Sequence, residues 1–136
     1  MSIPSALKHH VIKRAKLRCE YCGLAQAGQE AAFHIDHIIP FIAGGPTTAD
    51  NLALACVSCS LRKGARKIAI DPRTGENANL FHPRRENWAD HFAWRGCQVM
   101  GLSSTGRATV AALRLNRTLI VGIRAEEKIL GRHPPS

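Results

Sequence analysis

Between Cys19 and Leu61 this chain has no lysine and no arginine, although the protein as a whole carries a formal net charge of +9. Cations crowd both sides of this window instead, while nearly every type of residue that binds metals occurs inside it. The cations just before the window are Lys8, Lys13, Arg14, Lys16 and Arg18, and those just after it are Arg62, Lys63, Arg66 and Lys67. This layout favours a metal centre that lies next to a polyanion.

The chain also lacks an apolar run of the roughly 20 residues that a membrane-spanning helix needs. Its first residues contain neither the hydrophobic stretch nor the small-residue cleavage site of a signal peptide. We therefore expect a cytoplasmic protein with no membrane partner. A length of 136 residues, of which 45% are hydrophobic, favours a single folded domain over a disordered tail.

The excess of positive charge favours a nucleic acid as the partner. The sequence pI is about 10.0, and lysines and arginines that neutralise phosphates gain free energy by releasing condensed counterions. The alternative is that the surplus only keeps a small domain soluble. Because the cations cluster around the metal-binding window, we favour the nucleic-acid interpretation. The sequence indicates no oligomeric state.

Four of the five cysteines form two Cys-x-x-Cys pairs, and Cys97 is left over. The pairs are Cys19 with Cys22 and Cys56 with Cys59. Tetrahedral zinc needs four thiolates about 3.8 Å apart, and two short turns can supply two sulfurs each. The alternatives are two redox motifs or buried cysteines without a metal, but a redox motif usually occurs once, in a βαβ context. The spacing predicts a structural Zn²⁺ site.

The hydrophobic pattern predicts an α+β fold. We expect a helix over residues 4–16, a strand over 31–39, a basic helix over 57–67, a hairpin that turns near Gly96, and helices over 104–115 and 118–130. Residues 1–70 form the predicted core with its zinc site. Residues 71–136 form a C-terminal hairpin and helical extension, which we expect to pack on the core as one domain.

The segment between the two cysteine pairs contains His34, Asp36 and His37. In a regular strand His34 and Asp36 share one face and His37 points to the other, so convergence requires the strand to bend or end, as Pro40 suggests. Asp36 offers a hard oxygen ligand for Mg²⁺ or Mn²⁺, and the imidazole of His37 can take a proton from water. A hydrogen-bonded surface pair is the alternative.

These motifs together resemble the HNH endonucleases of the ββα-metal type. The resemblance covers about residues 14–67 and rests on Cys19-x-x-Cys22, His34-x-Asp36-His37-Ile-Ile-Pro40, Gly44-Gly45, Asn51-Leu52, Cys56-x-x-Cys59 and Lys63-Gly64. It implies a small zinc-tied ββα-metal core that acts as a metal-dependent DNA endonuclease. It further implies that His37 is the general base, that Asp36 binds the catalytic metal, and that Asn51 braces the loop or orients His37.

One position departs from the family. Its members have an asparagine or histidine metal ligand directly after the last cysteine, where this chain has Ser60. Either a water bridges Ser60 to the metal, or another side chain substitutes, or the site is impaired. The last case predicts a zinc-stabilised DNA-binding module derived from a nuclease. His34 is a candidate auxiliary ligand, with an exposed strand histidine as the alternative.

The remaining candidates are basic residues and histidines outside the window. Four cations occupy one side of the predicted basic helix, where we expect them to hold phosphates, and two more follow later in the chain. They are Arg62, Lys63, Arg66 and Lys67, then Arg84 and Arg85. His82 and His91 are candidates to compensate for Ser60, with a structural role beside aromatic residues as the alternative.

Overall fold

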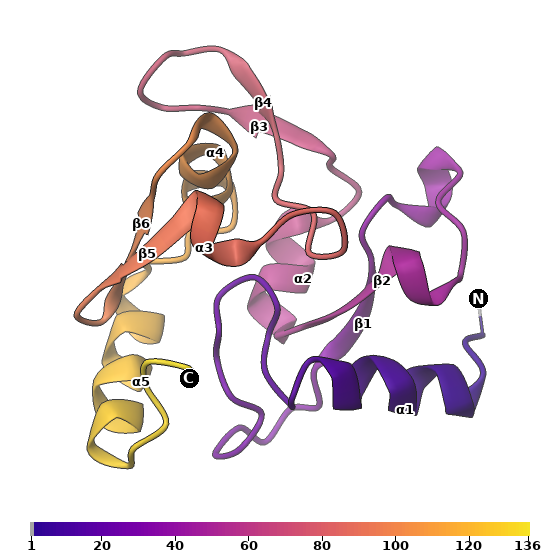
Figure 1. The fold of residues 1–136 in the computed structure, drawn as a ribbon, viewed down its shortest axis with the longest axis horizontal. Coiled ribbons are helices and arrows are strands. Elements are labelled where there is room, and N and C mark those ends of the chain that lie inside the picture. Colours follow the sequence, from indigo (N-terminus) through magenta and orange to yellow (C-terminus); the bar gives the residue numbers. More distant parts are fainter. Residues whose placement is uncertain (1) are drawn as a thin grey trace. The chain divides into compact units, whose positions relative to one another are not determined.

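The computed structural model describes residues 2–136 and divides them into two compact units. Unit 1 contains the residues up to Lys67 together with the return segment His82–Arg85, and unit 2 contains Ile68–Phe81 and Glu86–Ser136 (Figure 1). The secondary structure of both units is α+β, as predicted. The packing of the extension on the core stays a prediction.

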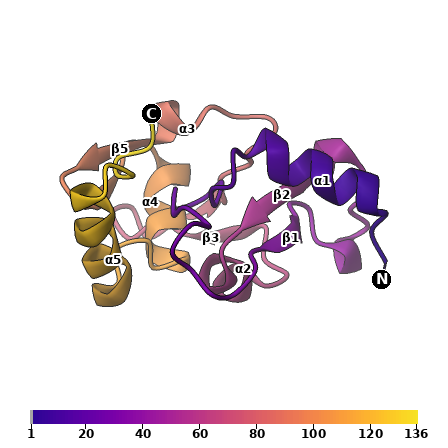
Figure 2. The same cartoon turned by 90° about the horizontal axis from the view of Figure 1, so that it is seen from below.

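Unit 1 is built around a two-stranded hairpin between two helices. Strand β1 (His34–His37) pairs antiparallel with β2 (Leu52–Ala55), so that His34 lies opposite Ala55 and His37 opposite Leu52. Helix α1 (Ser5–Arg14) lies on one side of the hairpin and α2 (Val57–Lys63) on the other (Figures 1 and 2). The order β1, β2, α2 is the predicted ββα core.

The core of unit 1 lies between α1 and the hairpin. Val11 on α1 and Leu52 and Leu54 on β2 are almost fully buried, and the partly buried Leu7 and Ile35 pack against them. Alternation along each strand places Ile35 toward α1, and therefore Asp36 toward α2. Burial of these apolar side chains fixes which face of β1 carries which polar residue.

Two helices of unit 1 are shorter than the sequence pattern predicts. Helix α1 ends at Arg14, and Lys16 and Leu17 beyond it take positive φ angles of 55° and 57°. Helix α2 ends at Lys63 because Gly64 takes a φ of 54°, which breaks the helical hydrogen bonding. The prediction of a helix over 57–67 is therefore wrong at its C-terminal end, and Arg66 and Lys67 lie outside the helix.

Unit 2 consists of two hairpins and three helices. Its first hairpin pairs β3 (Ile68–Ile70) with β4 (Asn77–Asn79), and its second pairs β5 (Phe92–Arg95) with β6 (Gln98–Gly101). Its helices are α3 (Trp88–His91), α4 (Ser104–Ala112) and α5 (Thr118–Ile129). The predicted hairpin turn near Gly96 and the two predicted C-terminal helices are confirmed, with slightly earlier helix ends.

Buried side chains of the second hairpin and of α4 and α5 make the core of unit 2, whereas neither strand of the first hairpin has a buried residue. Phe92, Val99, Ala108 and Ile120 are at most 1% exposed. No helix within residues 2–136 is long and apolar enough to cross a bilayer.

Candidate functional site

Four buried cysteines meet in unit 1. The Sγ atoms of Cys19, Cys22, Cys56 and Cys59 all lie within 4.8 Å of one another, and those of Cys22 and Cys56 are 3.7 Å apart. Four sulfurs bound to a tetrahedral zinc at about 2.3 Å would lie about 3.8 Å from one another, close to the Cys22–Cys56 distance. Within residues 2–136 this is the one cluster of three or more His, Cys, Asp or Glu ligands.

The surroundings of the sulfurs also fit a metal. The backbone N–H of Cys22 donates to Cys19 Sγ and that of Cys59 donates to Cys56 Sγ, both at 3.4 Å, which favours the thiolate form. Burial, however, raises the pKa of the Cys19 thiol well above its usual value, so a cation is needed to keep the sulfur deprotonated. The buried cluster of four cysteines therefore fits the predicted structural zinc.

Asp36 is held by two side chains that come from the elements that carry the cysteines. The Tyr21 hydroxyl, from the turn between Cys19 and Cys22, donates to Asp36 Oδ2 at 3.0 Å. Lys63 Nζ, at the end of α2, lies 3.1 Å from the same oxygen. Burial raises the pKa of Asp36, and the charge of Lys63 opposes this rise. The carboxylate is thus desolvated, paired and fixed in position.

The position of Lys63 contradicts the prediction that this residue contacts phosphate. Its side chain is 2% exposed, and Nζ donates to the carbonyl oxygen of His37 at 3.0 Å in addition to its ion pair with Asp36. Lys63 therefore connects the two residues of the Asp-His motif from inside the unit. The prediction that it holds a flanking phosphate is wrong, because its ammonium group faces the motif rather than the solvent.

Arg84 is likewise internal to unit 1. It forms an ion pair with Glu20, whose other oxygen, Oε2, accepts the backbone N–H of Leu54 at 2.9 Å. Burial lowers the pKa of Arg84 to about 10, so it remains charged at neutral pH. The prediction that Arg84 contacts phosphate is replaced by a structural role, in which it joins the first cysteine turn to the return segment.

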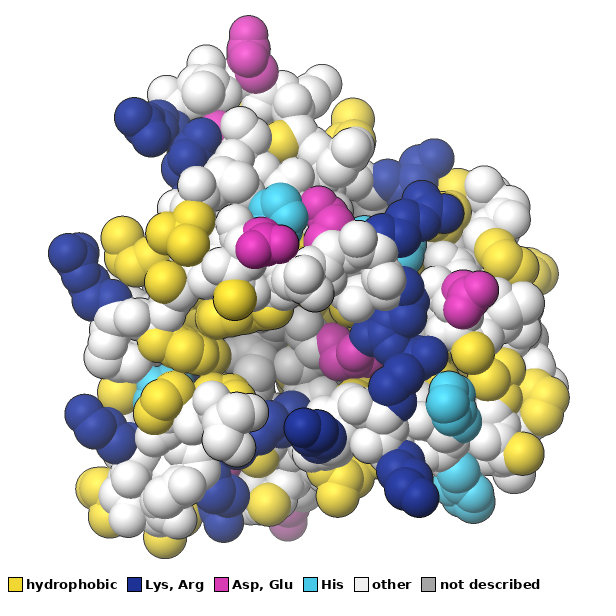
Figure 3. All heavy atoms as spheres, viewed as in Figure 1, with side chains coloured by type: hydrophobic (Ala, Val, Ile, Leu, Met, Phe, Trp, Pro, Cys, Tyr) yellow, Lys and Arg dark blue, Asp and Glu magenta, His cyan; other side chains and the backbone are white. Residues whose placement is uncertain are grey.

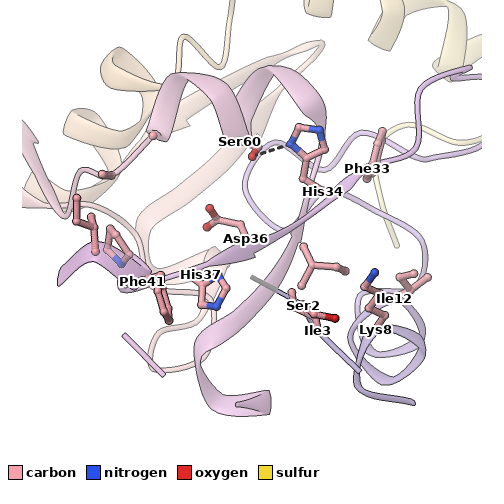
Figure 4. A pocket seen from close by; sticks show the side chains of 15 residues that line it. Ser2, Ile3, Lys8, Ile12, Phe33, His34, Asp36, His37, Phe41 and Ser60 are labelled. Carbon is pink, nitrogen blue, oxygen red and sulfur yellow. Dashed lines mark hydrogen bonds between the residues drawn. The ribbon is translucent and has the colours of Figure 1, made fainter. Parts of the chain in front are cut away.

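His37 projects from the face of β1 opposite to Asp36 (Figure 4). Its Nε2 lies 3.0 Å from Thr47 Oγ1, and its ring lies edge-on to Phe41 with the ring centroids 5.9 Å apart. The two residues come from the loop that follows the strand. They fix the orientation of the imidazole.

Asn51 braces that loop. Its Oδ1 accepts the backbone N–H of Ile39 at 2.8 Å, and its Nδ2 donates to the carbonyl oxygens of Ile39 and Pro46 at 3.0 and 2.9 Å. Gly45 allows this close packing, since a Cβ there would lie 1.8 Å from Ile39 O. Of the two roles expected for Asn51, the contacts match loop bracing.

His34 and Ser60 face each other on the α2 side of β1. The His34 Nδ1 and Ser60 Oγ atoms are 2.9 Å apart (Figure 4). Asp36 points to the same side of the strand. The imidazole, the hydroxyl and the carboxylate therefore share the space between β1 and α2.

His34, Asp36, His37 and Ser60 border one groove in unit 1. It has a volume of about 980 Å³, and Lys8 and Phe41 are among its other walls. The groove runs along the free edge of β1, because β2 pairs with the other edge. Residues from both faces of the strand reach it there, so Asp36 and His37 border one groove although both lie within β1 and point to opposite faces.

The two histidines predicted to compensate for Ser60 have partners of their own. His82 Nδ1 accepts the backbone N–H groups of Arg84 and Arg85, both at 3.2 Å. His91 belongs to unit 2, where Nε2 pairs with Glu86 at 3.0 Å and Nδ1 lies 2.6 Å from Ser103 Oγ. Both histidines therefore have the structural role that sequence reasoning gave as the alternative.

The other cations predicted to contact phosphate reach the surface of unit 1. Arg66, Lys67 and Arg85 are exposed, while Arg62 is half-buried and its Nε donates to Ser58 Oγ at 3.2 Å. In the space-filling view, Lys and Arg side chains gather over α1 and the neighbouring surface of unit 1 (Figure 3). This surface suits a polyanion.

Sequence reasoning missed Tyr21 and Thr47. Tyr21 stands between two cysteines, and its position inside a predicted zinc turn marks it as a residue next to a metal site. No local pattern marks Thr47, because its contact with His37 depends on the path of the whole loop.

Comparison with known families agrees with this geometry. The family model described as HNH endonuclease matches residues 19–66, which include both cysteine pairs, the Asp-His motif and Asn51. No curated protein and no solved structure matches the chain. Residues 19–66 are therefore an HNH endonuclease domain, with a four-cysteine cluster that fits its zinc.

Proposed function

We propose that this protein is a metal-dependent endonuclease that hydrolyses phosphodiester bonds in DNA. The observation that carries the proposal is the groove along the edge of β1, where a desolvated carboxylate and an oriented imidazole lie within an HNH domain. The positive charge of the chain supports DNA as the partner. The exposed Arg66, Lys67 and Arg85, with Arg62, are the proposed phosphate contacts.

His37 is the proposed general base. With the Thr47 hydroxyl as the acceptor for Nε2–H, the second nitrogen, Nδ1, carries the lone pair that takes a proton from water. The resulting hydroxide attacks phosphorus, and the bond to the 3′ oxygen breaks. Asn51 contributes by holding the loop that carries Thr47, so its effect on catalysis is indirect.

Asp36 is the proposed ligand of the catalytic Mg²⁺ or Mn²⁺. Tyr21 and Lys63 both contact Oδ2, which leaves Oδ1 for a metal. Carboxylate oxygen is a donor that these hard cations prefer. A bound divalent ion would stabilise the negative charge that develops on the phosphate and on the departing oxygen.

His34 is the proposed substitute for the ligand that is absent at position 60. It lies on the same face of β1 as Asp36, it is exposed, and its Nδ1 is within hydrogen-bond distance of Ser60 Oγ. Of the three explanations for Ser60, this contact favours a substituting side chain. Ser60 then orients the imidazole.

A catalytically impaired DNA-binding module is the second candidate. It is favoured by Ser60 and by the ion pair in which Lys63 already neutralises Asp36. A binding module would need no divalent ion other than zinc, whereas the nuclease requires one. The two candidates therefore differ in a property that is simple to measure.

The test is a nicking assay on supercoiled plasmid with Mg²⁺, with Mn²⁺, and without added divalent ions. We expect nicking with either ion, its loss in His37→Ala with DNA binding and zinc content unchanged, and a large loss in His34→Ala. Ser60→Asn tests the departure directly. Nicking by His37→Ala at the parent rate would refute the mechanism, and a parent that binds DNA without cutting it, while Ser60→Asn cuts, would establish the impaired module.

A further inference from the structure

Two large apolar side chains stand exposed at the mouth of the groove. Phe41 is 60% exposed and Ile42 is 84% exposed, in the single-turn 3-10 helix Phe41–Ala43 that follows Pro40. Both line the groove that holds Asp36 and His37. Adjacent exposed hydrophobic side chains at the rim of a groove are a common feature of ligand-binding surfaces.

Hydrogen bonds hold the turn that presents them. The backbone N–H groups of Ala43 and Gly45 both donate to the Pro40 carbonyl oxygen, at 2.9 and 3.0 Å, and that of Gly44 donates to Phe41 at 3.0 Å. Asn51 ties both flanks of the same turn. A binding group held in this way loses little conformational entropy on contact with a ligand.

The chemistry beside the turn selects the ligand. The Phe41 ring lies 5.9 Å from the ring of His37 (Figure 4), the proposed base that acts at the scissile phosphate. Phe41 has no charge with which to bind a phosphate, but its ring face can stack on a nucleobase. Lys8 lines the same groove and supplies a cation for the backbone. His37 would then act on the phosphate of a nucleotide while Phe41 contacts a neighbouring base.

We propose that the Phe41–Ile42 turn is a stacking platform for an unpaired base next to the scissile phosphate. This inference rests on the proposed DNA-binding function and adds a preference for unpaired DNA, which that function alone does not imply. Because a stacked base must first leave its duplex, the protein should bind single-stranded or locally unpaired DNA more tightly than continuous duplex.

The experiment measures binding with Ca²⁺ in place of Mg²⁺, so that DNA is not cut. The probes are a short single-stranded oligonucleotide that contains 2-aminopurine and a duplex of the same sequence. We expect Phe41→Ala to weaken binding of the single strand by about 5- to 150-fold. The slope of affinity against salt should not change, because no ion pair is lost. Phe41→Trp should restore both the affinity and the quenching of 2-aminopurine.

Leu61→Ala is the matched control, since Leu61 is 70% exposed in the same unit and we expect it to bind DNA as the parent does. Equal binding by Phe41→Ala and the parent overturns the platform and leaves the nuclease proposal intact. A parent that binds but does not cut, together with weaker binding by Phe41→Ala, sustains the platform and refutes catalysis. A parent that binds no DNA overturns both proposals. Dissociation of a parent dimer by Phe41→Ala overturns the platform and identifies a self-association surface.

Discussion

Replacing Lys63 with methionine removes the ammonium group from a buried ion pair while it keeps most of the side-chain volume. The Lys63 and Asp36 side chains are only 2% and 9% exposed, and Nζ lies 3.1 Å from Oδ2. Breaking a buried pair leaves one charge without compensation, which typically costs about 3–5 kcal/mol. We expect Lys63→Met to destabilise unit 1 by about this amount.

The second step of the test removes the other charge. In Lys63→Met/Asp36→Asn neither partner is ionised, and the amide oxygen can still accept the Tyr21 hydroxyl. Replacing both members of a buried pair with neutral groups is often close to neutral, so the double variant should recover most of the lost stability. Equal stability of the single and double variants would refute the assignment of the loss to an unpaired Asp36.

The pH dependence has a defined sign. Burial raises the pKa of Asp36 and Lys63 opposes that rise, so Lys63→Met should raise the pKa of Asp36 further. At pH values between the pKa of Asp36 in the unfolded state, about 3.9, and its raised pKa in the folded state, the folded protein binds more protons than the unfolded protein. The stability of the single variant should therefore fall as pH rises through this interval. The double variant should not show this fall.

Unit 1 must be observed separately from unit 2. Both tryptophans, Trp88 and Trp94, belong to unit 2, so tryptophan fluorescence during urea unfolding reports on that unit. Cobalt in place of zinc gives a thiolate absorption band that reports on the cysteine cluster in unit 1. We expect the Lys63 variants to shift the cobalt transition and leave the tryptophan transition in place.

Three further outcomes are expected. Asn51→Ala should cost about 1–3 kcal/mol and slow nicking, because three part-buried hydrogen bonds to the backbone of Ile39 and Pro46 are lost; unchanged urea midpoint and rate would contradict the bracing role. Binding of a structural zinc contributes on the order of 10 kcal/mol to folding, so removal of zinc should unfold unit 1 while the tryptophan signal stays native. Loss of both signals together would show that unit 2 depends on the metal. Tyr21→Phe should cost about 1.5–3 kcal/mol and raise the Mg²⁺ concentration for half-maximal nicking, since Asp36 loses a donor; an unchanged Mg²⁺ requirement would mean that Tyr21 does not position the carboxylate.

Local spacing predicted the zinc cluster well. Two sulfurs in each short turn need no long-range detail, and the four Sγ atoms meet as expected. The face of Asp36 was predictable as well, because a short strand with one apolar face has only one register that buries it. Each cysteine turn and the alternation along the strand depend only on residues close together in the sequence.

The basic helix shows where such reasoning fails. A helix over 57–67 would place four cations on one side, but Gly64 ends α2 at Lys63. Lys63 lies one turn after the buried Cys59 and therefore on the inward face of α2, where it becomes a buried partner of Asp36 and not a phosphate contact. The earlier end of the helix takes Arg66 and Lys67 out of it, and helix ends are the least certain part of a periodic pattern.

The contacts on Asp36 link the zinc site to the proposed chemistry. Tyr21 lies between the first two cysteines, and Lys63 closes the helix that begins at the third and carries the fourth. Both residues hold Oδ2, so the position of the remaining oxygen depends on both cysteine turns at once. If the metal only stabilised the fold, an apolar cluster of equal stability could take its place, and Asp36 would keep its position in the groove. Here the geometry of the cysteine cluster sets the geometry of the carboxylate, because the groups that orient Asp36 are carried by the same elements as the cysteines.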